Sequence, residues 1–265
     1  MTTTSTSPVA GHALAAQLAE KEMWCSSLPA KKLLEKFIPI SKDKIRMIRY
    51  GRDIERTQRG FLSRAEARKA LGIDQNAIAV GLVSRIDPQK GIKEFLEGAL
   101  PLMKSQSQLN LIFIGGRTED DPKAWAYGEA LEKYHKDLSP EIAKRIHFKG
   151  AMKDSFQYMP ALDLYALPSY KECFALSLLE AQLAGLPVLG TSSGGTPDIV
   201  IENQTGYLFE PENSSSAGEA LKRALSTQPK WSEFGNRAQA RVIQEFNFEK
   251  VSGAIIENYR TLLQT

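Results

Sequence analysis

The sequence predicts an α/β fold built on a doubly wound parallel sheet. Apolar runs such as AIAVGLVS at residues 77–84 have the composition of strands that are buried on both faces of such a sheet. Segments with apolar residues at helical spacing separate these runs, so that strand and helix alternate five or six times along the chain. Turns rich in glycine, serine and proline lie at the junctions.

The expected strands are short aliphatic runs that end at glycine, proline or polar residues. Most of them are followed by a segment with helical periodicity, which a parallel connection requires. In chain order the expected strands are residues 45–50, 77–84, 109–115, 146–149, 162–167, 187–191 and 206–209.

The expected helices carry apolar residues at every third or fourth position. Residues 11–37 have this pattern, and Pro29 is expected to break them into two helices. Ser63 and Glu66 form a predicted capping box for a helix that Gly72 ends. The other expected helices are residues 92–102, 125–138, short helices near 155 and after 193–198, a helix from about 175, and residues 215–225, 231–246 and 248–263.

The chain has 265 residues, enough for one large domain with extensions. We expect an N-terminal tail and helical segment at residues 1–40. Residues 41–247 are expected to form one Rossmann-like domain, on which a C-terminal helix at 248–265 packs back.

Composition narrows the class of protein. The 34 basic and 31 acidic residues give a net charge of +3, too small to predict nucleic-acid binding. The sequence lacks an apolar run of about 18 residues and a signal-like N-terminus, so we expect a cytoplasmic protein, with peripheral attachment to a membrane surface as the alternative. Cys25 and Cys173 lack metal-ligand spacing, so we expect no metal site.

The stretch PSYKECFALSLLEAQLAGLPVLG at residues 168–190 contains the main candidate site. A loop leads into a helix near Ala175, and the free N–H groups of a helix start favour an anion. Glu172 and Glu180 lie on either side, about 12 Å apart if the interval is helical. Such carboxylates suit hydroxyl donors that flank a diphosphate, as in a nucleotide-sugar. The alternative is that both are ordinary surface charges.

A second candidate loop, residues 85–91, follows the expected strand at 77–84. The carboxyl ends of strands are where open α/β sheets bind ligands. Arg85 and Lys90 are therefore placed to reach a diphosphate, with a pair of solvated charges as the alternative.

Several motifs occur together in family-like order. They are SRIDPQKG at 84–91, the E-x7-E pair Glu172 and Glu180, SGGTPDIV at 193–200, TGYLFEPEN at 205–213 and FNFEKVSGAIIENY at 246–259. From about Ile45 onward the chain resembles the C-terminal donor-binding domain of GT-B glycosyltransferases, specifically glycosyltransferase family 4, also described as glycosyl transferases group 1. The resemblance implies that residues 41–247 bind a nucleotide-sugar.

The resemblance also implies roles for individual residues. Arg85 and Lys90 match the basic pair that grips the donor diphosphate, and Glu172 matches the glutamate near the transferred sugar, where it binds rather than attacks. Glu180 matches the glutamate that takes the ribose hydroxyls. The remaining donor-binding positions implied in this way are Ser84, Gly150, Ala151, Met152, Phe174, Ala175 and Leu176.

The activity implied by the resemblance is retaining transfer of a hexose from a UDP- or GDP-sugar, without a metal or other cofactor. The acceptor is a sugar, lipid or polysaccharide that the sequence does not identify. A GT-B enzyme has two Rossmann-like domains and this chain has room for one, so we expect the acceptor half to be missing. Either a partner chain supplies it, or the sequence is part of a longer protein, or transfer has been lost. The alternatives are a noncatalytic nucleotide-sugar-binding or scaffold subunit and, more weakly, a sugar-nucleotide epimerase.

Overall fold

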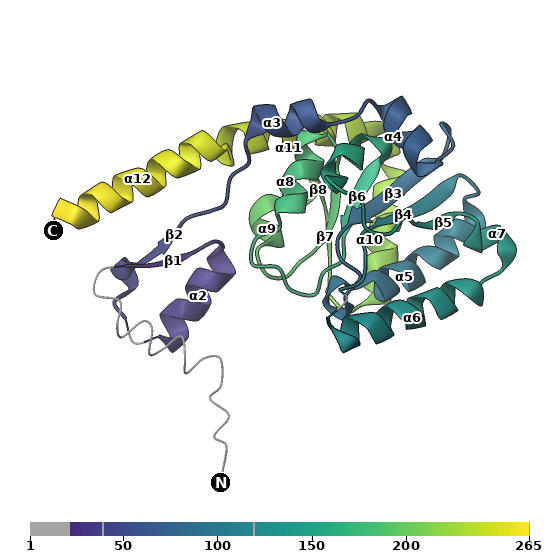
Figure 1. Ribbon diagram of the computed structural model, residues 1–265, viewed down its shortest axis with the longest axis horizontal. Helices are drawn as coiled ribbons and strands as arrows, with labels where there is room; N and C mark the ends of the chain where they lie inside the picture. The colour runs from purple at the N-terminus through teal and green to yellow at the C-terminus, as the bar shows by residue number, and fades with distance from the viewer. Residues whose placement is uncertain (1–21, 39, 119, 265) are drawn as a thin grey trace, which may run out of the picture.

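A six-stranded parallel sheet forms the centre of the molecule (Figure 1). The structure is a computed structural model that describes residues 22–38, 40–118 and 120–264. The strand order is β5-β4-β3-β6-β7-β8. The strands are β3 (Ile78–Val83), β4 (Leu109–Ile114), β5 (Ile146–Phe148), β6 (Leu164–Leu167), β7 (Val188–Thr191) and β8 (Gly206–Phe209). The predicted fold class is confirmed.

Helices cover both faces of this sheet, and each face has its own apolar core. Phe95 and Leu96 belong to the core on one face, and Leu178 and Leu179 to the core on the other. The α-helices around the sheet are α3 (Ile54–Gly60), α4 (Arg64–Leu71), α5 (Ile92–Ser105), α6 (Pro122–Lys136), α7 (Pro140–Ala143), α8 (Leu176–Leu183), α9 (Thr196–Ile199), α10 (Ser214–Ser226) and α11 (Trp231–Glu245). Three 3₁₀ helices also lie around the sheet: η2 (Pro88–Lys90), η3 (Ser155–Ala161) and η4 (Gln228–Lys230). We call this unit the body.

The order of the strands determines where a ligand can bind. From β3 the chain adds β4 and β5 on one side, then returns to place β6, β7 and β8 on the other side. The loops after β3 and β6 therefore leave neighbouring strands in opposite directions. This is the switch point at which open α/β sheets form a crevice.

A second, smaller unit lies apart from the body sheet (Figure 1). Its strands β1 (Met23–Cys25) and β2 (Ile45–Met47) pair in parallel and are joined through α2 (Leu28–Phe37) and the 3₁₀ helix η1 (Lys42–Lys44). The C-terminal helix α12 (Phe248–Gln264) runs beside these strands, and the rings of Trp24 and Tyr259 lie 4.9 Å apart. We call β1, α2, η1, β2 and α12 the small unit.

The small unit corrects two predictions. Residues 23–25 were expected to be helical, but they form a strand because they pair with β2. Pro29 does not break a helix either: it lies in the first turn of α2, where its missing N–H costs no hydrogen bond. The predicted helical residues 11–21 lie outside the described part of the chain.

The sheet of the small unit also crosses the predicted boundary between residues 40 and 41, because β1 precedes it and β2 follows it. The C-terminal helix α12 lies against β1 and β2 rather than along the six-stranded sheet. The division of the chain into domains stays a prediction.

Two chain segments connect the small unit to the body, and they run side by side. Arg52 N–H donates to Phe246 O at 2.8 Å, and Phe248 N–H donates to Arg52 O at 2.9 Å. A Cβ on Gly51 would lie 2.9 Å from Phe248 Cα, so only glycine allows this approach without a shift. We call this crossing the joint.

Local signals explain the ends of several elements. The capping box of Ser63 and Glu66 begins α4, and Gly72 ends it with a φ of 61°. Both features were predicted. Within the described residues, no helix combines the length and apolar character needed to span a bilayer.

Candidate functional site

Three loops meet at the carboxyl edge of the sheet, after β3, β6 and β7. Tyr170 N–H donates to Gln89 O at 2.8 Å, which joins the first two loops. Ser193 Oγ donates to Tyr170 O at 2.5 Å, and Gly195 N–H donates to Glu172 O at 2.7 Å, which joins the second to the third. Main-chain contacts therefore hold the loop that carries Glu172 on both sides.

Two glycines allow these loops to approach so closely. Gly91 has a φ of 61°, and a Cβ there would lie 2.2 Å from Pro168 O. Gly194 has a φ of 55°, and its Cβ would lie 2.1 Å from Glu172 O. Any other residue would strain the backbone and push the loops apart.

Lys90 and Glu172 form an ion pair at the centre of the three loops. Lys90 Nζ lies 2.5 Å from Glu172 Oε1, and about one fifth of each side chain is exposed, 20% and 19%. Lys90 ends η2, whose first turn is capped by Asp87 Oδ1, which accepts from Gln89 N–H at 2.8 Å. The structure thus brings together two of the residues that the sequence singled out.

The N-terminus of α8 begins beside Glu172. The helix begins after Ala175, as predicted, and no described side chain makes a capping hydrogen bond at this N-cap position. Phe174 and Ala175 are buried, whereas Leu176 is 37% exposed. This helix start is therefore a place where an anion can accept main-chain hydrogen bonds.

Glu180 is buried within α8 and pairs with Arg52, a residue that the sequence did not single out. Burial lowers the pKa of the Arg52 guanidinium, and its Nε has no hydrogen-bond partner among the described residues. The joint fixes the main chain of Arg52, so Glu180 is linked directly to the connection between the two units. No motif marks Arg52, because its contact depends on how the chain crosses itself.

Arg85 does not join the ion pair of Lys90 and Glu172. Its guanidinium donates to Thr118 Oγ1 at 3.1 Å, and the side chain is exposed. The four predicted charged side chains therefore lie in three separate contacts, Lys90 with Glu172, Arg85 with Thr118, and Glu180 with Arg52.

The predicted turn at Gly150, Ala151 and Met152 follows β5 at the same edge. Gly115 N–H donates to Gly150 O at 2.8 Å. Ser84 N–H donates to Ile114 O at 3.0 Å, which links the end of β3 to the end of β4. Main-chain hydrogen bonds therefore connect Ser84, through the end of β4, to this turn. We call Ser84, Gly150, Ala151 and Met152 the rim.

Among the residues that the structure describes, there is no group of three or more histidine, cysteine, aspartate or glutamate side chains that could hold a metal ion.

Comparison with known proteins shows which family shares these features. The family model described as glycosyl transferases group 1 matches residues 63–241, which include all three loops and α8. The chain is 28% identical over 220 residues to the lipopolysaccharide core biosynthesis mannosyltransferase LpsB of Rhizobium meliloti, covering 82% of this chain and 61% of that protein. The chain thus spans about three fifths of the length of this relative.

Two solved structures are similar in fold. The crystal structure of Anabaena HepE in complex with UDP and glucose superposes with a TM-score of 0.83 and 23% identity, covering 95% of this chain and 66% of HepE. The C-terminal domain of a glycosyl transferase group 1 family protein, LpcC of Francisella tularensis, has a TM-score of 0.63 and 26% identity, covering 72% of this chain and 97% of that domain.

Proposed function

This chain belongs to the glycosyl transferases group 1 family, and we propose that it is the donor-binding half of a glycosyltransferase. The proposed reaction is retaining, metal-independent transfer of a hexose from a nucleoside diphosphate sugar. The observation that carries the proposal is the ion pair of Lys90 and Glu172 beside the uncapped start of α8, at the switch point of the sheet.

The proposed diphosphate lies at the N-terminus of α8. Its oxygens accept hydrogen bonds from the first N–H groups of the helix, and Lys90 supplies a cation at the same place. When the bond between the sugar C1 and the phosphate oxygen breaks, the electron pair goes to the phosphate, and these groups stabilise the charge that develops there. A fixed cation in this position is the reason we propose that no metal and no other cofactor is needed.

The two glutamates bind hydroxyl groups on either side of the diphosphate. Glu172 would accept from the hydroxyls of the transferred hexose, and Lys90 would hold the carboxylate in place. Glu180 would accept from the ribose hydroxyls, with Arg52 opposite it. In the proposed front-face mechanism the acceptor oxygen bonds to C1 on the side that the phosphate leaves, and a phosphate oxygen takes the acceptor proton.

Arg85 needs a different side-chain position for its proposed role. It is exposed and held only by Thr118, so its long side chain can turn toward a bound diphosphate at small cost. The rim of Ser84, Gly150, Ala151 and Met152 is proposed to hold the base through main-chain atoms. Phe174, Ala175 and Leu176 are proposed to contact sugar and phosphate through main-chain N–H groups.

The donor and partners are proposed from the relatives. LpsB is named as a mannosyltransferase, which supports a hexose, and UDP- and GDP-sugars are the donors to test. Because the chain spans about three fifths of this relative, we propose that the acceptor-binding half comes from a partner polypeptide or from a further part of the same protein. The acceptor is proposed to be a sugar, lipid or polysaccharide, and the setting to be the cytoplasm or a membrane surface facing it.

Calorimetric titration of the protein with UDP-glucose, UDP-N-acetylglucosamine and GDP-mannose tests the proposal. We expect at least one to bind, and Lys90→Ala to weaken it by roughly 10- to 100-fold, as for the loss of a charged hydrogen bond. Lys104→Ala, an exposed lysine of α5, is the matched control and should bind as the wild type does. If the wild type binds none of these nucleotides, the proposal is wrong.

A further inference from the structure

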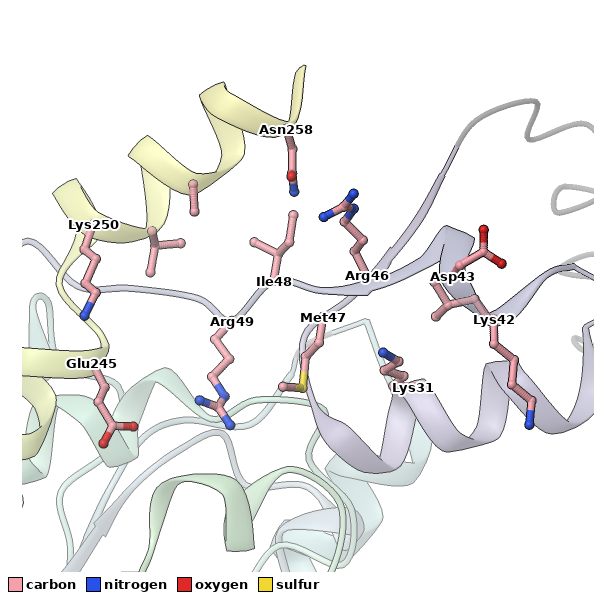
Figure 2. A pocket seen from close by; sticks show the side chains of 13 residues that line it. Lys31, Lys42, Asp43, Arg46, Met47, Ile48, Arg49, Glu245, Lys250 and Asn258 are labelled. Atoms are coloured by element: carbon pink, nitrogen blue, oxygen red, sulfur yellow. The ribbon is translucent and has the colours of Figure 1, made fainter. Parts of the chain in front are cut away.

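A cavity in the described part of the chain lies in the small unit, away from the carboxyl edge of the body sheet. It has a volume of about 650 Å³ and lies between α2, β2 and α12. Figure 2 shows β2 crossing this cavity, with α12 on one side and α2 on the other. None of the residues assigned to the donor site lines it. We call it the β2 groove.

The β2 groove opens at a free strand edge. Ile48 N–H donates to Cys25 O at 2.8 Å, so Ile48 and, two residues earlier, Arg46 turn their main-chain groups toward β1. The N–H and C=O groups of Met47 and Arg49 therefore face the opposite edge, where no described strand pairs with β2. No residue of β1 lines the groove, which places it on this open side.

The two helices cover opposite faces of β2 and leave the edge between them open. In Figure 2 the side chains of Arg46 and Ile48 point toward α12, whereas those of Met47 and Arg49 point to the other side. An extended chain that paired with this edge would therefore lie between two helices, as an inner strand of a parallel sheet does.

The lining of the groove is basic around an apolar base. Five cations line it with two carboxylates, and the cations are Lys31, Lys42, Arg46, Arg49 and Lys250. Lys31 lies 3.9 Å from Glu35 and Arg46 pairs with Glu22, which leaves Lys42, Arg49 and Lys250 without a carboxylate partner among the described residues. The carboxylates are Asp43 and Glu245, and the apolar lining comes from Ile45, Met47, Ile48, Val251 and Ala254.

Arg49 provides an independent sign that the groove lacks an acceptor. Its guanidinium lies over the ring of Phe246 at 5.8 Å, and its Nε is buried without a hydrogen-bond partner among the described residues. Buried donors are seldom left unpaired, because an unmade hydrogen bond costs free energy.

We propose that the β2 groove binds an extended acidic segment of a partner polypeptide, which adds a strand to the free edge of β2. The main chain of the segment pairs with Met47 and Arg49. Its acidic side chains face the cations, and alternate apolar side chains contact the groove base. A lipid or phosphate ligand would satisfy the cations alone, whereas a peptide satisfies both the cations and the strand edge. This inference does not depend on donor binding at the body.

The test uses a fluorescein-labelled peptide of about nine alternating glutamate and valine residues, long enough to pair along an average strand. Fluorescence anisotropy with the full chain should show binding of this peptide but not of a matched lysine–valine peptide. A strand presents every second amide to its neighbour. N-methylation of the alternate amides that face β2 should therefore abolish peptide binding, and N-methylation of the other alternate amides should leave the affinity unchanged.

Charge reversal locates the site. The double variant Lys42→Glu, Lys250→Glu should weaken the acidic peptide by more than about tenfold, corresponding to 1.4 kcal/mol. The control is Lys69→Glu, Lys104→Glu, two exposed lysines on body helices, which should bind normally. The circular dichroism spectrum of the double variant should match that of the wild type, which shows that loss of binding is not loss of folding. The milder single variant Lys42→Glu serves as a second check.

Several outcomes would overturn the proposal. One is no binding of the acidic peptide to the wild type, and another is equal binding after methylation of either amide set, which would indicate a plain anion site. Binding of phosphatidylserine vesicles through Lys42 and Lys250, without peptide binding, would assign the groove to a lipid surface. A dimer in analytical ultracentrifugation that the peptide cannot dissociate would assign it to a second copy of the chain.

Discussion

The body and the small unit both contain a parallel sheet, but they bury very different amounts of apolar surface. Helix α5 of the body buries five side chains, whereas α2 of the small unit buries none. Of the eleven exposed large apolar residues described, seven lie on α2 and α12: Leu28, Leu33, Phe37, Phe248, Ile256, Tyr259 and Leu263. A parallel sheet needs both faces covered. The helices of the body bury their apolar side chains against its own sheet, whereas those of the small unit leave many of theirs exposed, where another surface can cover them.

The largest expected effect comes from a charge buried in the body. Arg68 is fully buried and donates to Ala161 O at 3.0 Å, to Asp74 O at 2.8 Å and to Gln75 O at 2.7 Å. It also pairs with Asp163 at 2.8 Å. Replacing it with alanine leaves a cavity and removes the donor from the buried Ala161 O, so Arg68→Ala should lower the free energy of unfolding by about 3–5 kcal/mol in urea titrations.

Arg64 provides the matched control for Arg68, because it pairs with the same carboxylate from the surface. Its side chain is 47% exposed. Arg64→Ala should therefore cost less than about 1 kcal/mol. Equal losses for the two variants would contradict the view that burial, rather than the ion pair itself, sets the cost.

A second pair of variants compares the two units directly. Leu96 on α5 is fully buried, whereas Leu33 on α2 is 54% exposed. Leu96→Ala should lower the free energy of unfolding by about 2–5 kcal/mol, since it leaves a cavity. Leu33→Ala should change it by less than about 0.5 kcal/mol. A large loss for Leu33→Ala would show that the chain itself, or a second copy, covers α2 in solution.

A third prediction concerns the joint, where the two units meet the donor site. Arg52→Ala leaves Glu180 without its cation, in a buried position. If Glu180 binds ribose, calorimetry should show nucleotide affinity reduced by roughly 10-fold or more. Arg52→Lys should restore part of it, and Arg59→Ala, in an exposed pair with Glu55 on α3, should change nothing. Unchanged affinity in Arg52→Ala would mean that the joint and the donor site act separately.

The sequence predicted the body well because its strands are buried on both faces and read as continuous apolar runs. It did not predict the strand at Met23–Cys25, since three residues inside a helical pattern give no signal of their own. Their conformation depends on pairing with β2, about twenty residues further along the chain. Tertiary contacts overrode the local pattern there.

In the candidate site, too, some contacts could be predicted from the sequence and others could not. Lys90 and Glu172 each follow an expected strand, and the switch point of a doubly wound sheet brings such loops together, so their neighbourhood was predictable. Arg52 was not, because it reaches Glu180 only through the crossing at Phe246 and Phe248. Arg85 lies at the expected edge, but its hydrogen bond to Thr118 could not be predicted from spacing.

The smallest expected effect tests the outer edge of the body, where β5 has only three residues. His147 on β5 is partly buried and contacts Asn110 Oδ1 at 3.1 Å. Burial, with Lys149 and His135 nearby, lowers its pKa below the ordinary value of 6.5. The unfolded chain therefore takes up a proton at a higher pH than the folded chain. The stability that His147 contributes is complete above pH 6.5 and declines as the pH falls from there toward the folded pKa.

Thermal unfolding between about pH 8 and pH 5 should show this decline in the wild type and a shallower one in His147→Gln, since the carboxylates that also titrate are common to both. Parallel profiles would mean that the folded protein holds the proton as easily as the unfolded chain, and that this edge is more open to water than the structure shows.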